Sequence, residues 1–353
     1  MSVHVVDRDR FDPFAPGRPR ELMLQLWYPA NPQRDQTFAP CMPPKAAESF
    51  GLQPECMTHA YQSAPVARQR DPLFGVIPVP WMKRNYPVVL YSHAYSSSRG
   101  FGTVLIEELA SRGYIVVAVD HPYDAGAVEF PGGRVVTYQP EEPPSLGPPD
   151  LAWLDEANKR GLPVRVADMR FVVDSLAEMN EGKSSVEGLP SGLAGAMNLD
   201  RIGFFGHSLG GTTVAQAMLE DNRIKAGLSL DGAMPPAVRA SGLDNPILFI
   251  ASEQPDPYRA IESSWQVTNQ RGWHRGLRMT GTGHNSFTDL IVICTQMECG
   301  QGMESTLGSV NAGRAVAVQR AYLMTFFDGQ LKGRDLGLLN RPSQRYPEIV
   351  FLN

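Results

Sequence analysis

The sequence predicts an α/β protein whose central sheet is mostly parallel and is covered by helices on both faces. Two observations carry this prediction. Continuous apolar runs, typical of strands buried on both faces, alternate with stretches whose apolar residues recur at helical spacing. One strand-to-helix junction, at residues 206–210, also contains the sequence Gly-x-Ser-x-Gly. The length of 353 residues suits one large α/β unit, and we expect residues 1–353 to form a single domain.

The N-terminal part of the chain shows little regular pattern. Residues 3–6 resemble the start of a strand, and residues 21–28 alternate well enough for a strand that Pro29 ends. Residues 30–80 are rich in proline and polar residues, and we expect them to be irregular surface or cap structure.

The pattern becomes regular at residue 87. The predicted strands are 87–91, 114–119, 201–205, 226–230, 246–250 and 276–280. The predicted helices are 103–112, 164–179, 211–221 and 312–331. Residues 121–160 hold many prolines and glycines, so we interpret them as an excursion over the strand ends that forms a lid.

Composition excludes several classes of protein. The net charge is −5 and no basic stripe exists to neutralise phosphates, which argues against nucleic acid as a partner. No run approaches the length of a membrane span. The N-terminus lacks a basic segment followed by an apolar one, which predicts a cytoplasmic protein, or an extracellular one if a leader has been removed.

Cofactor and metal sites are not expected. The dinucleotide pattern Gly-x-Gly-x-x-Gly, the phosphate loop and the zinc motif His-Glu-x-x-His are all missing from the sequence. The cysteines form two local pairs, which fit either disulfides or reduced thiols better than a metal site: Cys41 with Cys56, and Cys294 with Cys299.

The candidate nucleophile is Ser208, in the sequence Gly206-His207-Ser208-Leu209-Gly210. In this motif the chain turns sharply from a strand into a helix, and the flanking glycines prevent a collision of side chains with neighbouring backbone. An apolar run precedes the motif and a helix-compatible stretch follows it, which is the context the motif requires. The sequence therefore predicts an α/β-hydrolase fold with a serine at the apex of the turn.

A serine hydroxyl needs a neighbouring base, and chain order selects His284 among the histidines. In α/β-hydrolases the base follows the nucleophile and the acid, and His284 lies in a glycine-rich loop after a late strand. His274 precedes that strand and should lie at the opposite end of the sheet. His207 adjoins the nucleophile, so we expect its side chain to point away from the catalytic side.

The acid of the triad has two candidate positions. The usual one follows the strand 246–250 and nominates Glu253 or Asp256; the other follows the strand 226–230 and nominates Asp231. A carboxylate at either position can hold the histidine tautomer and stabilise the imidazolium. Spacing alone leaves both open.

Five segments together resemble the plasma-type platelet-activating factor acetylhydrolases and their bacterial relatives. They occur in that family's order and are Arg20–Met23 leading to Trp27–Pro29, Tyr91–Ala94, Gly206–Gly211, Leu230–Pro235 and Gly283–Asp289. The resemblance implies that Asp231 is the acid, and that the protein hydrolyses short or modified acyl esters without a metal.

The resemblance also implies an oxyanion hole made by the backbone N–H groups of Tyr95 and Leu209. The chain departs from the family at Ala94, where the family has glycine. A positive φ at that position would strain alanine or force the loop to run differently.

The expected reaction is a two-step acyl transfer to water through Ser208, with a small-molecule ester as substrate. We expect apolar residues near the strand ends to select the ester, with Met234, Phe287 and Tyr123 as candidates. One alternative uses the same triad for acyl transfer or lactone formation in a biosynthetic pathway. Another, from a different class, is a non-catalytic binding protein on a hydrolase scaffold.

Overall fold

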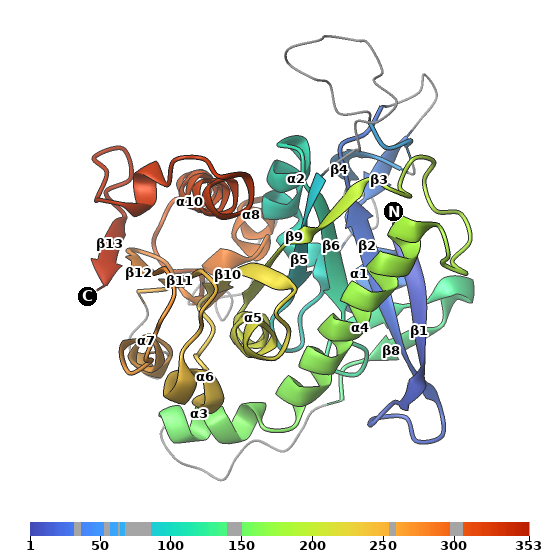
Figure 1. Ribbon diagram of the computed structural model, residues 1–353, viewed down its shortest axis with the longest axis horizontal. Helices are drawn as coiled ribbons and strands as arrows, with labels where there is room; N and C mark the ends of the chain where they lie inside the picture. Colours follow the sequence, from blue (N-terminus) through green and yellow to red (C-terminus); the bar gives the residue numbers. More distant parts are fainter. Residues whose placement is uncertain are drawn as a thin grey trace.

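A nine-stranded mixed sheet runs through the computed structural model (Figure 1). The structure describes residues 1–31, 37–52, 57–62, 64–67, 86–139, 150–253, 259–296 and 306–352. The strands lie in the order β1 (Ser2–Phe11), β2 (Pro19–Trp27), β6 (Ile115–Asp120), β5 (Tyr86–Ser92), β9 (Met197–His207), β10 (Ile224–Leu230), β11 (Ile247–Ala251), β12 (His274–Met279) and β13 (Ile349–Leu352).

The middle of the sheet, from β6 to β12, is parallel, and the strands at its two ends pair antiparallel. Every residue of β5 and β6 is buried, which explains why both strands are apolar up to their last residues, Ser92 and Asp120. Helices cover both faces, so the α/β-hydrolase fold expected from the sequence is confirmed.

Two groups of helices bury the two faces. One apolar core lies under α2 (Thr103–Ser111), α8 (Leu290–Gln296) and α10 (Ala312–Lys332). The other lies under α4 (Gly161–Glu181), α5 (Leu209–Glu220), α6 (Pro236–Ser241) and α7 (Arg259–Gln266).

The strand order reverses direction between β5 and β9. The chain passes from β5 outward to β6 and then returns to place β9 on the other side of β5. Ser92, the last residue of β5, is paired in register with Gly206 near the end of β9. In open α/β sheets the crevice at such a reversal, beyond the carboxyl ends of the strands, is where ligands bind.

The segment 30–80, expected to be irregular, contains regular elements in its described part. They are the strand pair β3 (Phe38–Pro40) and β4 (Met57–Tyr61) and the helix α1 (Pro44–Ser49). Short strands and a six-residue helix give too weak a periodicity for sequence reasoning to detect.

The described part of the excursion 121–160 contains a β-hairpin and a helix. A hairpin of β7 (Ala127–Glu129) and β8 (Val135–Thr137) is followed, after residues outside the described ranges, by helix α3 (Leu151–Asn158). The side chain of Arg239, on α6, pairs with Asp155 at 2.5 and 2.9 Å and so ties α3 to the body of the protein.

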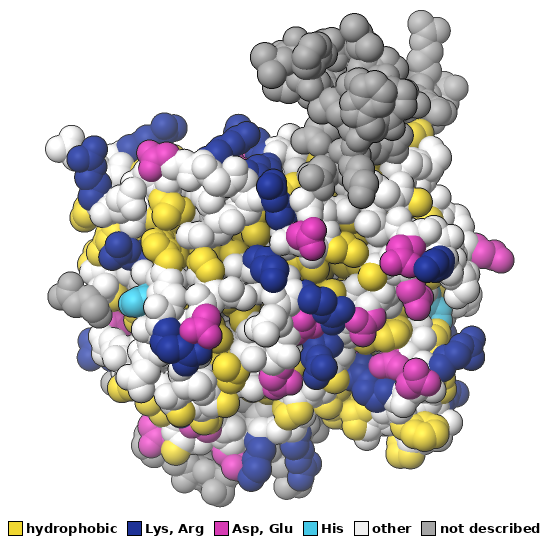
Figure 2. Space-filling view, viewed as in Figure 1, with side chains coloured by type: hydrophobic (Ala, Val, Ile, Leu, Met, Phe, Trp, Pro, Cys, Tyr) yellow, Lys and Arg dark blue, Asp and Glu magenta, His cyan; other side chains and the backbone are white. Residues whose placement is uncertain are grey.

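Cys41 and Cys294 are both disulfide-bonded, whereas Cys56 and Cys299 lie outside the described residues. Among the helices that the structure describes, none has the length and apolar character needed to cross a membrane. On the face shown in Figure 2, basic and acidic side chains are interspersed over the described surface, so neither sign dominates there.

Candidate active site

Ser208 stands at a strained turn between β9 and α5. Its backbone has φ 56° and ψ −122°, a conformation that L-residues rarely adopt. The turn is tight because a side chain at Gly210 would place Cβ 2.1 Å from the carbonyl oxygen of Ser92, and one at Gly206 would lie 2.5 Å from Gly210. The glycines of the motif are therefore required by close backbone packing, as the sequence indicates.

His284 begins a short 3₁₀ helix, η3 (His284–Phe287), in the loop after β12. Its Nε2 lies 2.9 Å from the Ser208 hydroxyl and its Nδ1 lies 2.7 Å from a carboxylate oxygen of Asp231. The imidazole thus bridges the two residues. His274 is exposed at the start of β12 and bonds to the carbonyl of Gly272, away from Ser208.

Asp231 follows β10 and is almost completely buried, with 1% of its surface exposed. One carboxylate oxygen accepts the backbone N–H of Ser252 at 2.9 Å, and the other accepts the Ser252 hydroxyl at 2.7 Å. Burial opposes ionisation, but the hydrogen bonds and charge of His284, together with those from Ser252, outweigh it and lower the pKa of Asp231. The carboxylate is therefore charged near neutral pH.

The alternative acid Glu253 is hydrogen-bonded to the backbone of the loop that carries His284, and not to the His284 ring. Its carboxylate accepts the N–H of Gly281 at 2.7 Å, and its own N–H donates to the carbonyl of Thr282 at 3.1 Å. The third candidate, Asp256, lies outside the described residues.

The loop after β5 packs directly on the nucleophile turn. Tyr95 lies beside Ser208 and Leu209 in the wall of the same cleft. Leu209 is the first residue of α5, and the first N–H groups of a helix have no carbonyl acceptor within it, so the Leu209 N–H makes no hydrogen bond inside α5. Ala94 is not among the described non-glycine residues with positive φ, whereas Ser96 is, with φ 53°. Alanine therefore replaces glycine at position 94 without strain in the left-handed region.

His207 lies against the candidate base, and the expectation that it points away from the catalytic side is wrong. Its ring centre is 4.7 Å from that of His284, and its Nε2 donates to the His284 carbonyl at 2.7 Å. Burial, reinforced by the nearby imidazole of His284, lowers the pKa of His207 to about 3. This ring is thus neutral over the working pH range. Sequence reasoning missed the contact because it joins residues 77 positions apart.

Comparison with known proteins places the chain in a family. The sequence model described as platelet-activating factor acetylhydrolase, isoform II, matches residues 16–336. The chain belongs to this family. The resemblance noted in the sequence is thereby confirmed.

Individual members of this family and of its fold are similar to the chain over long stretches. A probable 1-alkyl-2-acetylglycerophosphocholine esterase from Arthroderma benhamiae is 28% identical over 76% of this chain and 66% of its own length. A platelet-activating factor acetylhydrolase from Cavia porcellus is 27% identical over 62% of this chain and 53% of its own. The aligned part thus spans between about half and two thirds of these relatives.

A solved structure resembles the whole chain. A ferulic acid esterase from Streptomyces cinnamoneus is 35% identical, covers 100% of this chain and 95% of its own, and superposes with a TM-score of 0.78.

The cleft above Ser208 has a volume of about 770 Å³; α3 lines one part of it, and the start of α5 and the loops after β5, β10 and β12 line most of the rest. Aromatic residues from three segments face it, namely Tyr95, Tyr138 and Trp153, and the rings of Tyr95 and Tyr138 meet edge to face at 5.0 Å. Met234 and Phe287, expected to select the substrate, are buried in the two cores, and neither they nor Tyr123 line the cleft.

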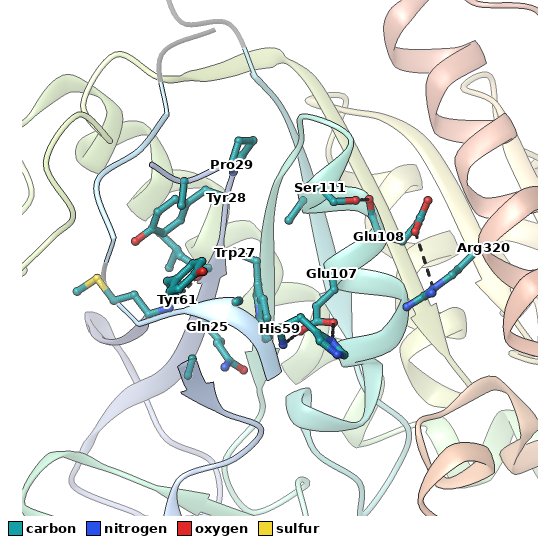
Figure 3. A pocket seen from close by; sticks show the side chains of 16 residues that line it. Gln25, Trp27, Tyr28, Pro29, His59, Tyr61, Glu107, Glu108, Ser111 and Arg320 are labelled. Atoms are coloured by element: carbon teal, nitrogen blue, oxygen red, sulfur yellow. Dashed lines mark hydrogen bonds and ion pairs between the residues drawn. The ribbon is translucent and has the colours of Figure 1, made fainter. Parts of the chain in front are cut away.

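A second cavity, of about 370 Å³, lies between β2 and α2, at the opposite edge of the sheet (Figure 3). It contains a serine, a histidine and a carboxylate, but they are not connected as a triad. Ser111 donates to the carbonyl of Glu108, whereas His59 is paired with Glu107. These are two separate pairs, and neither joins the serine to the histidine.

Proposed function

We propose that this chain is a serine carboxylic-ester hydrolase with Ser208 as nucleophile, His284 as general base and Asp231 as the acid that orients it. The observation that carries the proposal is the imidazole of His284, which lies 2.9 Å from the Ser208 hydroxyl and 2.7 Å from Asp231 at the floor of an open cleft. A weakly nucleophilic hydroxyl becomes reactive when such a base accepts its proton.

In the first step the Ser208 oxygen attacks the ester carbonyl carbon while His284 Nε2 takes the hydroxyl proton. The negative charge that develops on the carbonyl oxygen is held by the N–H groups of Leu209 and Tyr95. Collapse of the tetrahedral intermediate breaks the bond to the alcohol, which leaves with the proton from His284. Water then repeats the sequence on the acyl-serine and releases the acid.

The names of the curated relatives favour a short acyl group as substrate, and we propose short or modified acyl esters of the platelet-activating-factor type. A second candidate is an ester of an aromatic acid. The aromatic lining of the cleft by Tyr95, Tyr138 and Trp153 favours it, as does the ferulic acid esterase that the whole chain resembles.

The test compares wild type with Ser208→Ala on three kinds of ester: p-nitrophenyl esters from acetate to dodecanoate, an sn-2-acetyl alkyl glycerophosphocholine, and methyl ferulate. We expect wild type to turn over and the variant to lose at least about 10⁴-fold in kcat. The ratio of kcat/KM on the acetyl lipid and on ferulate decides between the two substrate classes.

Two outcomes would contradict the proposed hydrolase function. Products bearing a competing alcohol or amine in place of free acid would indicate an acyltransferase. A wild type that is inert on every ester and does not react with a fluorophosphonate would indicate a binding protein.

A further inference from the structure

A chain of buried hydrogen bonds lies beneath the loop that follows β5. The ring of His121 lies 2.9 Å from a carboxylate oxygen of Asp168 through Nδ1 and 3.0 Å from the Ser92 hydroxyl through Nε2. All three residues are completely buried, so no substrate reaches them. Burial lowers the pKa of His121, and its neutral ring donates to Asp168 and accepts from Ser92. This connectivity resembles a catalytic triad, but its position makes it structural.

Arg165, on α4, connects this chain to the loop. Its guanidinium forms a fork with Asp124, with Nε at 2.7 Å and Nη2 at 2.5 Å from the two carboxylate oxygens. The same group donates to the Ser92 hydroxyl at 3.2 Å, to the carbonyl of His93, and to the carbonyl of Ala94 at 3.3 Å. Arg165 is completely buried.

The carbonyl of Ala94 has two further donors, the ring of His93 and the backbone N–H of Ser97 at 3.2 Å. His93 Nδ1 lies 2.6 Å from it, while His93 Nε2 accepts the backbone N–H of His121 at 3.2 Å. Burial, together with the charge of Arg165, holds the pKa of His93 well below its usual range. The neutral ring therefore has one donor and one acceptor, and both are used. Arg165 and His93, both in the protein interior, and the backbone N–H of Ser97 together fix the position of the Ala94 carbonyl.

A fixed carbonyl at Ala94 also fixes the N–H of Tyr95. The two groups belong to one planar trans peptide and point in opposite directions. The carbonyl points into the interior, toward Arg165 and His93. The N–H is therefore directed to the other side, where Tyr95 lines the cleft with Ser208.

We propose that Arg165, oriented by Asp124, is a positioning residue that holds the Tyr95 N–H as an oxyanion donor. The inference rests on the proposed function, because it assigns the anchor of one donor in that reaction. Arginine suits this task because its rigid fork can satisfy a carboxylate and carbonyl oxygens at the same time, whereas lysine is a single point donor.

The test is Arg165→Lys, with Arg20→Lys as its matched control. Arg20 is also completely buried and donates to Asp168, Asp12 and the Pro122 carbonyl, but it makes none of the contacts to residues 93–95. Both variants keep the charge and should lower the melting temperature. Only Arg165→Lys should lower kcat, by about 10²-fold, since removing one oxyanion donor costs about 10²–10³-fold.

Two readouts separate positioning from a general loss of structure. KM should stay within about threefold of wild type, because the oxyanion forms only in the transition state. The affinity for a trifluoromethyl ketone, which forms a tetrahedral adduct on serine, should fall in parallel with kcat. If Arg165→Lys fails to fold, Asp124→Asn provides the second test, since it keeps the side-chain volume and removes the ionic fork; we expect at least a tenfold loss of kcat.

The outcomes distinguish this inference from the proposed function. If wild type hydrolyses esters and Arg165→Lys turns over as fast as Arg20→Lys, or Asp124→Asn as fast as wild type, the positioning role is overturned and the triad stands. If wild type neither hydrolyses esters nor reacts with a fluorophosphonate, the proposed function itself is overturned.

Discussion

Replacing Asp231 by asparagine should reverse the tautomer of His284. The backbone N–H of Ser252 donates to one Asp231 oxygen at 2.9 Å, so the amide oxygen of the variant must take that position. The amide NH₂ then occupies the other position, 2.7 Å from His284 Nδ1. Facing a donor, Nδ1 becomes the acceptor and the ring proton moves to Nε2, which can no longer accept the proton of Ser208.

The expected loss is about 10⁴-fold in kcat, or about 5.4 kcal/mol of transition-state stabilisation. The assay is hydrolysis of p-nitrophenyl acetate, with Glu253→Gln as the matched control. Glu253 follows the neighbouring strand and accepts the Gly281 N–H, a contact that glutamine retains through its oxygen, so the control should stay within about threefold of wild type. Refutation would be an Asp231→Asn enzyme with a tenth of the wild-type rate, or a Glu253→Gln enzyme that loses as much as Asp231→Asn.

Three further changes test the surroundings of the site. Gly210→Ala would place Cβ 2.1 Å from the Ser92 carbonyl oxygen, so we expect several kcal/mol of destabilisation by thermal unfolding and little remaining activity. His207→Phe removes the donor to the His284 carbonyl, and kcat should fall about tenfold. Because the pKa of His207 is about 3, the pH–rate profile of this variant should keep the wild-type shape between pH 5 and 9. Burial raises the pKa of Asp289 to about 7, so the folded state binds the proton of this carboxyl more tightly than the unfolded state does. The protonated carboxyl therefore contributes stability that is fully present below about pH 4 and is lost as the pH rises to 7. In denaturant titrations, Asp289→Asn should abolish this pH dependence.

The parallel part of the sheet could be predicted from the sequence because burial on both faces leaves a simple signal. All seven residues of β5 and all six of β6 are buried, and both strands are apolar up to their last residue, Ser92 in β5 and Asp120 in β6. Strand β13 is different: it has four residues, of which only Ile349 is buried, and it pairs with β12 from more than 60 positions away. Short strands at sheet edges carry no periodicity of their own, so only tertiary pairing defines them.

The roles proposed for Ser208 and His284 follow from a motif and from chain order, which a sequence expresses directly. The choice of acid does not. Leu230 and Ile250 are in register on neighbouring parallel strands, so the residues after them, Asp231 and Glu253, leave the sheet at the same edge. Which carboxylate contacts the imidazole depends on where each side chain points after its strand ends, and the spacing of residues in the sequence does not specify that direction.

Backbone strain links the stability of this site to its chemistry. Among the described non-glycine residues, positive φ occurs at Ser208 and Asp231, which supply two members of the proposed triad, at Ser96 in the loop after Tyr95, and at Tyr123. Such conformations cost about 1–3 kcal/mol each and persist only where the surroundings over-determine them. Here the two turns hold each other, since a side chain at Gly232 would place Cβ 2.3 Å from the Ser208 carbonyl oxygen. The packing that keeps Ser208, the proposed nucleophile, strained therefore also sets the position of Asp231, the proposed acid, so that neither turn can relax without displacing the other.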